Sequence, residues 1–158
     1  MTAEDQGREL LHLISEGYVF VDSRFCVRDI NEVGLRMARR PRSDFIGQVL
    51  WELAPQLHES ETKPMLEEAM REQKPVSLEQ FHRWTNGRES WLEMRVHPAD
   101  GGLAIFYRDI TDKKQSEEEL KRAQAELMHA SRLSAMGTMA ATLAHELAQP
   151  LSPANNSI

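Results

Sequence analysis

The alternation of hydrophobic and polar positions divides the first half of the chain into a hairpin and a series of helices. Residues 4–16 carry leucines at helical spacing and stop at a glycine, which predicts a short amphipathic helix. The runs 18–21 and 25–30 are rich in β-branched and aromatic residues and enclose a polar turn, so they predict a β-hairpin. From Asn31 the pattern becomes helical in short pieces, and residues 61–73 form a firmer helix with one apolar stripe.

Three more strands are predicted after these helices. They cover residues 75–84, 90–97 and 103–110, and the middle strand alternates with every second residue apolar. The first two are joined by Asn86-Gly87, a pair that is typical of hairpin turns because both residues tolerate positive φ. This order of elements predicts an α+β domain, in which helices flank a five-stranded antiparallel sheet.

A single long helix is predicted after the sheet. Between Thr111, a suitable N-cap, and Pro150 the only glycine is Gly137. Such a helix would extend about 60 Å, at about 1.5 Å per residue, and no small domain can cover it. The spacing of its apolar positions slips by one residue near 130–136, which predicts a coiled-coil linker followed by a wider bundle. The simplest partner is a second, parallel copy of the chain, and the alternative is an exposed single helix. The apolar seam consists of Leu120, Ala123, Leu127, Ala130, Leu133, Met136, Ala140, Leu143, Leu147 and Leu151.

Composition and charge narrow the class of protein. A length of 158 residues allows one globular domain and an extension. The net charge of -6 and the acidic residues around the arginines at 36–42 argue against a nucleic-acid partner. A single cysteine, Cys26, excludes an internal disulfide and fits a reducing cytoplasm. No apolar run reaches the roughly 18 residues of a membrane span, and the N-terminus lacks the basic segment of a signal peptide, so we expect a cytoplasmic protein.

The candidate chemistry lies near the end of the long helix, in the sequence His-Glu-Leu-Ala-Gln-Pro-Leu that starts at His145. A helical wheel places His145 opposite the apolar stripe, so we expect its ring to face solvent. A neutral imidazole is a nucleophile at pH 7, and the carboxylate of Glu146 can orient the ring and accept a proton. Pro150 removes a helical N–H and clashes with the preceding turn, which predicts a kink or the helix end. An inert surface histidine is the alternative interpretation.

These residues resemble the phosphoacceptor motif of sensor histidine kinases, in the subgroup whose motif reads His-Glu-Leu-Asn-Gln-Pro-Leu. The resemblance implies that His145 is the phosphorylated histidine, that Glu146 assists proton transfer, and that Pro150 is the kinking proline. Gln149 matches the position where many relatives carry a Thr or Asn that helps to remove phosphate from the response regulator. Ala148 also departs from the subgroup, which often has Asn there.

The upstream domain resembles a PAS sensor domain in its order of strands and helices. Asp109-Ile110-Thr111 is similar to the sequence that ends the PAS sheet and starts the signalling helix, so the resemblance implies that these three residues transmit the signal. Asn31 lies where PAS domains often carry an asparagine. The implied segments are an N-terminal amphipathic helix at 1–16, the PAS domain at 17–111, a coiled-coil linker at 112–135 and the first helix of the dimerisation domain at 136–158.

The sequence also limits metals and cofactors. His145-Glu146 begins like a zinc-protease motif, but Gln149 stands where the second histidine ligand would be, so no metal is expected. The sequence has no phosphate-binding loop, and the resemblance to histidine kinases implies that ATP and Mg²⁺ belong to a kinase domain outside this chain. The resemblance to PAS domains also argues against haem and flavin. Haem-binding members carry a histidine in the long helix, whereas residues 61–73 have none, and flavin-binding members carry a cysteine in an Asn-Cys-Arg motif, which Cys26 lacks. The PAS ligand stays open. Cys26 is expected to be a buried structural residue. The three tryptophans, expected to fill the core rather than line a cavity, are Trp51, Trp84 and Trp91.

The sequence therefore predicts the sensory and phosphoacceptor part of a two-component histidine kinase. A signal at the PAS domain would control phosphorylation of His145 and transfer to the receiver domain of a response regulator. We expect a homodimer with no nucleic-acid or membrane partner, and a chain that is inactive without its ATP-binding domain. The alternative is a PAS dimerisation module with a coiled coil in an adaptor or transcription regulator, in which His145 is not phosphorylated.

Overall fold

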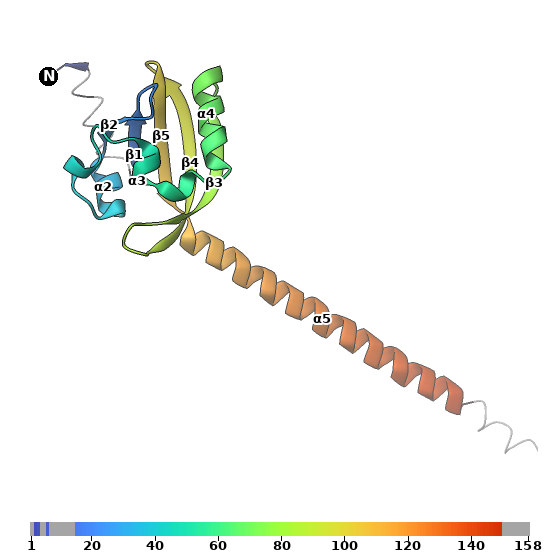
Figure 1. The fold of residues 1–158 in the computed structure, drawn as a ribbon. Coiled ribbons are helices and arrows are strands. Elements are labelled where there is room, and N and C mark those ends of the chain that lie inside the picture. Colours follow the sequence, from blue (N-terminus) through green and yellow to red (C-terminus); the bar gives the residue numbers. More distant parts are fainter. Residues whose placement is uncertain (1, 4–5, 7–14, 150–158) are drawn as a thin grey trace, which may run out of the picture. The chain divides into compact units, whose positions relative to one another are not determined.

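The computed structural model describes residues 2–3, 6 and 15–149, and the chain divides into two units, residues 1–112 and 113–158. Most of the predicted N-terminal helix, together with Pro150 and Leu151, lies outside the described residues. The five-stranded antiparallel sheet with its flanking helices confirms the predicted α+β class (Figure 1). In chain order the elements are β1 (Gly17–Val21), β2 (Val27–Ile30), α2 (Glu32–Ala38), η1 (Arg42–Asp44), α3 (Leu50–Leu53), η2 (Pro55–Leu57), α4 (Thr62–Glu72), β3 (Val76–Arg83), β4 (Glu89–Ala99), β5 (Gly102–Asp109) and α5 (Thr111–Ala148).

The sheet has the strand order β2-β1-β5-β4-β3, with the first and last parts of the domain sequence paired at its centre. Val19 of β1 pairs with Ile105 of β5, which in turn pairs with Val96 of β4. All three side chains are buried, because alternate residues of neighbouring strands point to the same face of a sheet. These residues make the floor of the hydrophobic core.

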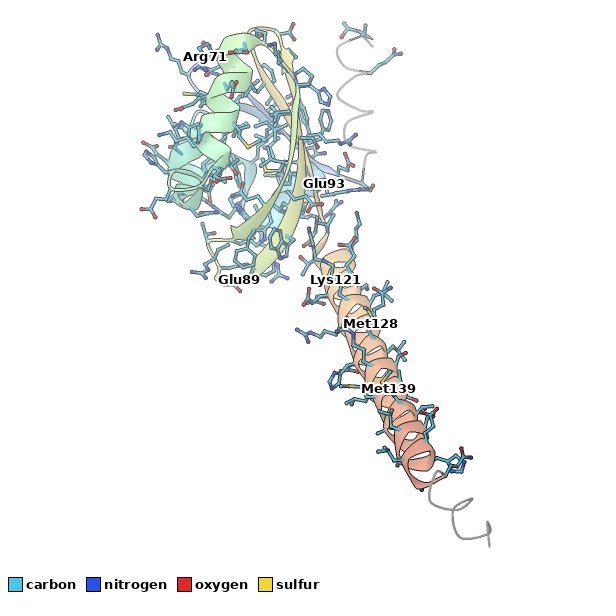
Figure 2. All side chains as sticks on the ribbon, turned by 90° about the vertical axis from the view of Figure 1, so that its right-hand side faces the viewer. Arg71, Glu89, Glu93, Lys121, Met128 and Met139 are labelled. Carbon is cyan, nitrogen blue, oxygen red and sulfur yellow. The ribbon has the colours of Figure 1, made fainter. Side chains whose placement is uncertain are left out.

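Helices cover that face of the sheet. Leu66 and Ala69 of α4 are buried in the same hydrophobic cluster as the core strands, at the spacing that the apolar stripe predicted. Figure 2 shows Arg71 on α4 and Glu93 on the sheet, away from this helix. Glu93 pairs with Arg108 of the neighbouring strand, with 2.5 Å between the carboxylate and Nε. The other face of the sheet therefore carries a cross-strand ion pair.

Asn31 connects the first hairpin to the helices. It is 1% exposed, and its side-chain oxygen accepts hydrogen bonds from the amides of Tyr18 (3.0 Å) and Gly34 (2.8 Å). Its amide nitrogen donates to the carbonyl of Glu16 at 2.9 Å. Asn31 therefore caps α2 and at the same time holds β1 beside it. This explains why an asparagine stands where the strand pattern ends.

The second strand begins later than the sequence pattern predicted. Phe25 has a φ of 61°, in the left-handed region, so the chain still turns there. The carboxylate of Asp22 accepts hydrogen bonds from the amides of Arg24 and Cys26 and stabilises this turn. Cys26 precedes β2, forms an isolated β-bridge to Val49 and is half-buried, so the expectation of a buried strand cysteine was wrong.

The long helix α5 has 38 residues and buries none of them within the described part of the chain. Its apolar side chains stay exposed, for example Leu127 at 71% and Leu147 at 76%. Thr111 is its first residue instead of the residue that precedes the helix, which corrects the predicted N-cap. Among the described residues, no helix has the length and apolar character to cross a membrane.

Candidate functional site

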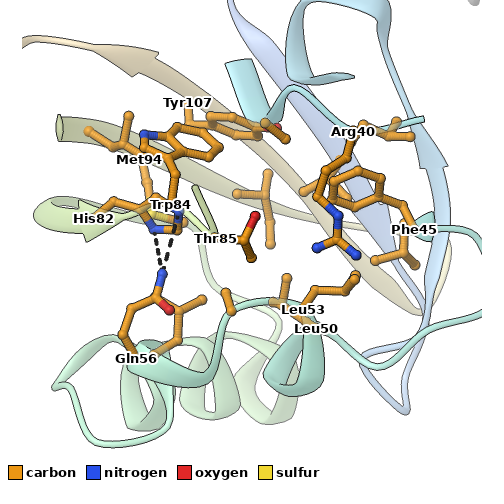
Figure 3. A pocket seen from close by; sticks show the side chains of 18 of the residues that line it. Arg40, Phe45, Leu50, Leu53, Gln56, His82, Trp84, Thr85, Met94 and Tyr107 are labelled. Carbon is orange, nitrogen blue, oxygen red and sulfur yellow. Dashed lines mark hydrogen bonds between the residues drawn. The ribbon is translucent and has the colours of Figure 1, made fainter. Parts of the chain in front are cut away.

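A cavity of about 100 Å³ lies against the inner face of the sheet. Its floor comes from β1, β4 and β5, and its walls come from the segment between α2 and η2 and from the end of β3. Figure 3 shows Leu50 and Leu53 on one side, with Met94 and Tyr107 among the residues across from them. Most of the lining is apolar, so the cavity suits a small ligand with an apolar body.

One end of the cavity carries a hydrogen-bonded amide–imidazole pair. The side-chain nitrogen of Gln56 lies 3.0 Å from Nδ1 of His82 and also donates to the carbonyl of Arg83 at 3.0 Å. Figure 3 draws the contacts between Gln56 and His82 as dashed lines. Burial, together with the positive charge of Arg88, lowers the pKa of His82 from 6.5 to about 4. His82 is therefore neutral at pH 7, and it presents an uncharged ring to the cavity.

Tyr107 and Trp84 provide two further polar groups in the wall. Burial raises the pKa of Tyr107 above its usual value, so its phenol stays neutral. A Cβ added at Gly17 or Gly34 would come within 2.6 Å of Tyr107 atoms, which explains why glycines stand at both positions. Trp84 packs edge-on against the ring of His82, with centroids 4.4 Å apart. Trp84 belongs to the hydrophobic core, as expected from the sequence, and it also lines the cavity.

A series of polar contacts runs from the cavity wall to the start of α5. Nε1 of Trp84 donates to the Ser90 hydroxyl at 3.1 Å. The Ser90 side chain interacts with the carboxylate of Asp109 and lowers its pKa. Oδ1 of Asp109 accepts hydrogen bonds from the Thr111 amide at 2.9 Å and from the Thr111 hydroxyl at 2.5 Å. The Thr111 hydroxyl also accepts from the amide of Trp91 at 2.9 Å. We call the series Trp84, Ser90, Asp109 and Thr111 the relay.

The relay depends on an ionised carboxylate. Burial raises the pKa of Asp109, but hydrogen bonds from Thr111 and Ser90 and the positive charge of Arg88 outweigh it, so the pKa lies below its ordinary value. Arg88 lies over the ring of Trp84, 4.9 Å from the centroid, and donates to the carbonyl of Met37. The same arginine therefore acts on both ends of the Trp84–Asp109 connection.

The three residues predicted to transmit a signal all bond or pack at the junction of β5 and α5. Asp109 and Thr111 belong to the relay, and Ile110 is 4% exposed. The amide of Ile110 donates to the carbonyl of Trp91 at 2.8 Å. The first turn of α5 is thereby attached to β4 through backbone as well as side-chain hydrogen bonds.

The predicted phosphoacceptor residues lie near the end of α5. His145, Glu146 and Gln149 are all exposed. The side-chain nitrogen of Gln149 lies 2.8 Å from Nε2 of His145, and its backbone amide donates to the His145 carbonyl at 3.0 Å. When the Gln149 amide donates to the ring, Nε2 is the acceptor and the ring proton is on Nδ1. Pro150 lies outside the described residues, so its predicted kink stays a prediction.

Sequence reasoning missed most of the cavity. Ser90 and Trp84 are adjacent to a hairpin turn in the sequence, and nothing in that pattern indicates a path to Asp109. His82 lies in the predicted strand 75–84, and nothing in the sequence around it indicates a cavity. Among the described residues, no three His, Cys, Asp or Glu side chains lie together as metal ligands do.

Comparison with known proteins shows the family. The family model described as "PAS fold" matches residues 11–115, so the chain belongs to the PAS family. The chain is 29% identical over 163 residues to the sensor protein FixL of Bradyrhizobium diazoefficiens, covering 98% of this chain and 32% of that protein. It is 27% identical over 147 residues to the sensor protein kinase FleS of Pseudomonas aeruginosa, covering 93% of this chain and 31% of that protein. The chain thus spans about a third of the length of these two curated relatives.

A solved structure shows the same fold. The PAS domain of a protein from Colwellia psychrerythraea superposes with a TM-score of 0.62 at 20% identity, covering 70% of this chain and 99% of that domain. This likeness agrees with the family match in giving the first unit a PAS fold, and the matches that cover most of this chain relate it to sensor histidine kinases.

Proposed function

We propose that this chain is the cytoplasmic sensory and phosphoacceptor part of a two-component histidine kinase. The observation that carries the proposal is the relay, which runs from the wall of the PAS cavity to the first residue of the helix that carries His145 and Glu146. A ligand that moves Trp84 changes the hydrogen bonds of Ser90 and Asp109, and thereby the start of α5. A signal is thus converted into a change at a helix terminus.

The proposed chemistry is transfer of one phosphoryl group to His145. A lone pair of the neutral ring attacks the γ-phosphorus of ATP, the bond between phosphorus and the bridging oxygen breaks, and ADP leaves. The ring proton passes to a base, for which Glu146 is the proposed acceptor. The phosphoryl group then moves to an aspartate of a response regulator. Gln149 is the residue proposed for the later removal of phosphate from that regulator.

ATP and Mg²⁺ are supplied by a kinase domain that is not part of residues 1–158. Within this chain we propose no haem and no flavin, because the cavity of about 100 Å³ is small for either group. The residues of this chain position the imidazole and transmit the signal. On this proposal the chain alone has no kinase activity.

The exposed apolar seam of α5 supports a parallel homodimer. Leu120, Leu127 and Leu143 are 59%, 71% and 52% exposed, and leucines at these spacings gain free energy by packing into a second helix. A dimer places the two copies of His145 on the outside of the paired helices, because the ring lies opposite the seam. Access of a kinase domain to that ring is then open to control by the helix pair.

The test is phosphorylation of the full chain by a histidine-kinase ATP-binding domain fused after residue 158. We expect acid-labile phosphate on the parent chain and loss of at least about 100-fold of it in His145→Gln, because the nucleophile is gone. His129→Gln is the matched control, since His129 is an exposed histidine of the same helix, and it should keep the label. Equal labelling of His145→Gln and the parent would contradict the proposal and favour a PAS dimerisation module in an adaptor or transcription regulator.

A further inference from the structure

One cation that lines the PAS cavity, Arg40, uses only part of its hydrogen-bonding capacity within the described residues. Arg40 lines the cavity, and its Nε lies 3.2 Å from the carboxylate of Asp44. The ring of Phe45 lies 5.2 Å from the guanidinium carbon. The two terminal nitrogens, Nη1 and Nη2, have no hydrogen-bond partner among the described residues. In Figure 3 this end of Arg40 points toward Leu50 and Leu53, into the cavity.

The charge of the lining favours an anion. None of the residues that line the cavity is an aspartate or a glutamate. The second arginine of the lining, Arg83, uses Nε and Nη2 for Glu89, at 3.0 and 2.7 Å. His82 is neutral at pH 7. Among the described residues, Arg40 is therefore the lining cation whose two terminal nitrogens both lack a hydrogen-bond partner, and a guanidinium with two free nitrogens matches a carboxylate.

The opposite end of the cavity limits the ligand to one charge. Gln56 and His82 hydrogen-bond each other, so this end presents an uncharged surface. The space between the two ends is lined by apolar side chains, including Leu50, Leu53 and Ile105. A second carboxylate would meet no available cation there and would lose its hydration without compensation. The lining therefore selects against dicarboxylates.

The size of the cavity limits the length of the ligand's apolar tail. A cavity of about 150 Å³ accommodates benzene, so about 100 Å³ accommodates a tail of about three to five carbons. We propose that the cavity binds a short linear monocarboxylate, with its carboxylate on Nη1 and Nη2 of Arg40 and its alkyl tail against Leu50, Leu53 and Ile105. This inference rests on the proposed function, because it names the ligand class of the sensor cavity.

The test is calorimetric titration of the full chain with butyrate, and with butan-1-ol as the neutral analogue of the same length. We expect butyrate to bind with a Kd of about 0.1 to 1 mM. In Arg40→Met the Kd should rise about 10- to 100-fold, since a charge-assisted contact is lost, and Arg40→Lys should recover part of the affinity. Arg36→Met is the matched control, because Arg36 is an exposed arginine that does not line the cavity, and the Kd of this variant should stay within about twofold of the parent.

Three results would overturn the inference: no heat of binding with butyrate, equal binding of butan-1-ol, or unchanged affinity in Arg40→Met. A circular dichroism spectrum and an unfolding curve of each variant separate loss of the site from loss of the fold. Failure of the ligand inference remains distinct from failure of the proposed function. If butyrate binds but does not change labelling of His145, the coupling is wrong and the ligand stands. If His145 is labelled and butyrate does not bind, the ligand class is wrong and the function stands.

Discussion

The PAS domain and the long helix differ in how far their apolar side chains are buried. In the domain, Leu66, Val96 and Leu103 are 0% exposed, and sheet and helices supply each other's covering surface. In α5, Leu127 and Leu147 remain more than two-thirds exposed at 71% and 76%, although the residue type is the same. In a two-layer domain the apolar faces of the sheet and of the helices bury each other within one chain. A single helix has no second layer to cover its apolar stripe, so burial of that stripe needs a partner. The domain is therefore suited to hold a ligand, and the helix is suited to respond to its neighbours.

The largest difference between the two regions is expected in the free energy of unfolding when one leucine of each is replaced by alanine. Leu66→Ala should lower the free energy of unfolding of the domain by about 2 to 5 kcal/mol, because it leaves a cavity under α4. Leu127→Ala, the matched control, should change domain unfolding by less than about 0.5 kcal/mol and instead weaken self-association. Chemical denaturation and sedimentation measure the two effects. A domain destabilised equally by both substitutions would remove the contrast between the regions.

The next effect is a pH dependence of the free energy of unfolding, which arises from His82 in the PAS domain. In the folded chain His82 stays neutral down to about pH 4, whereas in the unfolded chain it takes up a proton near pH 6.5. The unfolded chain thus binds more protons between these values, so the free energy of unfolding falls as the pH drops from 6.5 to 4. The loss reaches at most about 3 kcal/mol. Denaturation curves across this range should be less pH-dependent for His82→Gln, and an unchanged slope would show that another group is responsible.

A smaller effect is expected at the junction of the two regions. Asp109→Asn keeps the shape of the side chain but replaces charge-assisted hydrogen bonds to Thr111 with neutral ones, so we expect a loss of about 1 kcal/mol. Hydrogen exchange at the amides of Trp91 and Thr111 should accelerate. Asp112→Asn is the control, because it changes a neighbouring carboxylate that lies outside the relay. Equal exchange in both variants would argue that the relay does not hold the helix start.

The smallest effect is expected on the surface of α5. Glu118 and Arg122 form an i,i+4 pair with 3.8 Å between the charged groups, and both side chains are largely exposed. Glu118→Gln should change helix stability by about 0.3 kcal/mol, because water and salt screen such pairs. Thermal unfolding at low and high salt measures this. A loss larger than that of Asp109→Asn would mean that Glu118 contacts a partner helix in the assembled protein.

Much of the fold could be predicted because local patterns and tertiary packing agree. The alternation of Leu92, Met94 and Val96 placed them on one buried face, and Asn86-Gly87 marked the turn before them. The turn at Phe25 was missed because its left-handed conformation depends on hydrogen bonds to Asp22, whereas aromatic residues are typical of strands. Thr111 was assigned as a cap because its hydroxyl is suited to one, but that hydroxyl bonds to Trp91 and Asp109 instead.

The sequence by itself determined the order of elements, the PAS-like sheet, the exposed seam and the position of His145 opposite it. Each of these follows from spacing along one strand or helix, which chemistry within a few residues decides. The tertiary structure alone decided the cavity, the orientation of Arg40 into it, the depressed pKa of His82 and the path from Trp84 to Thr111. These features join residues far apart in the chain, and their energies come from burial and hydrogen bonds that exist only after the strands have paired.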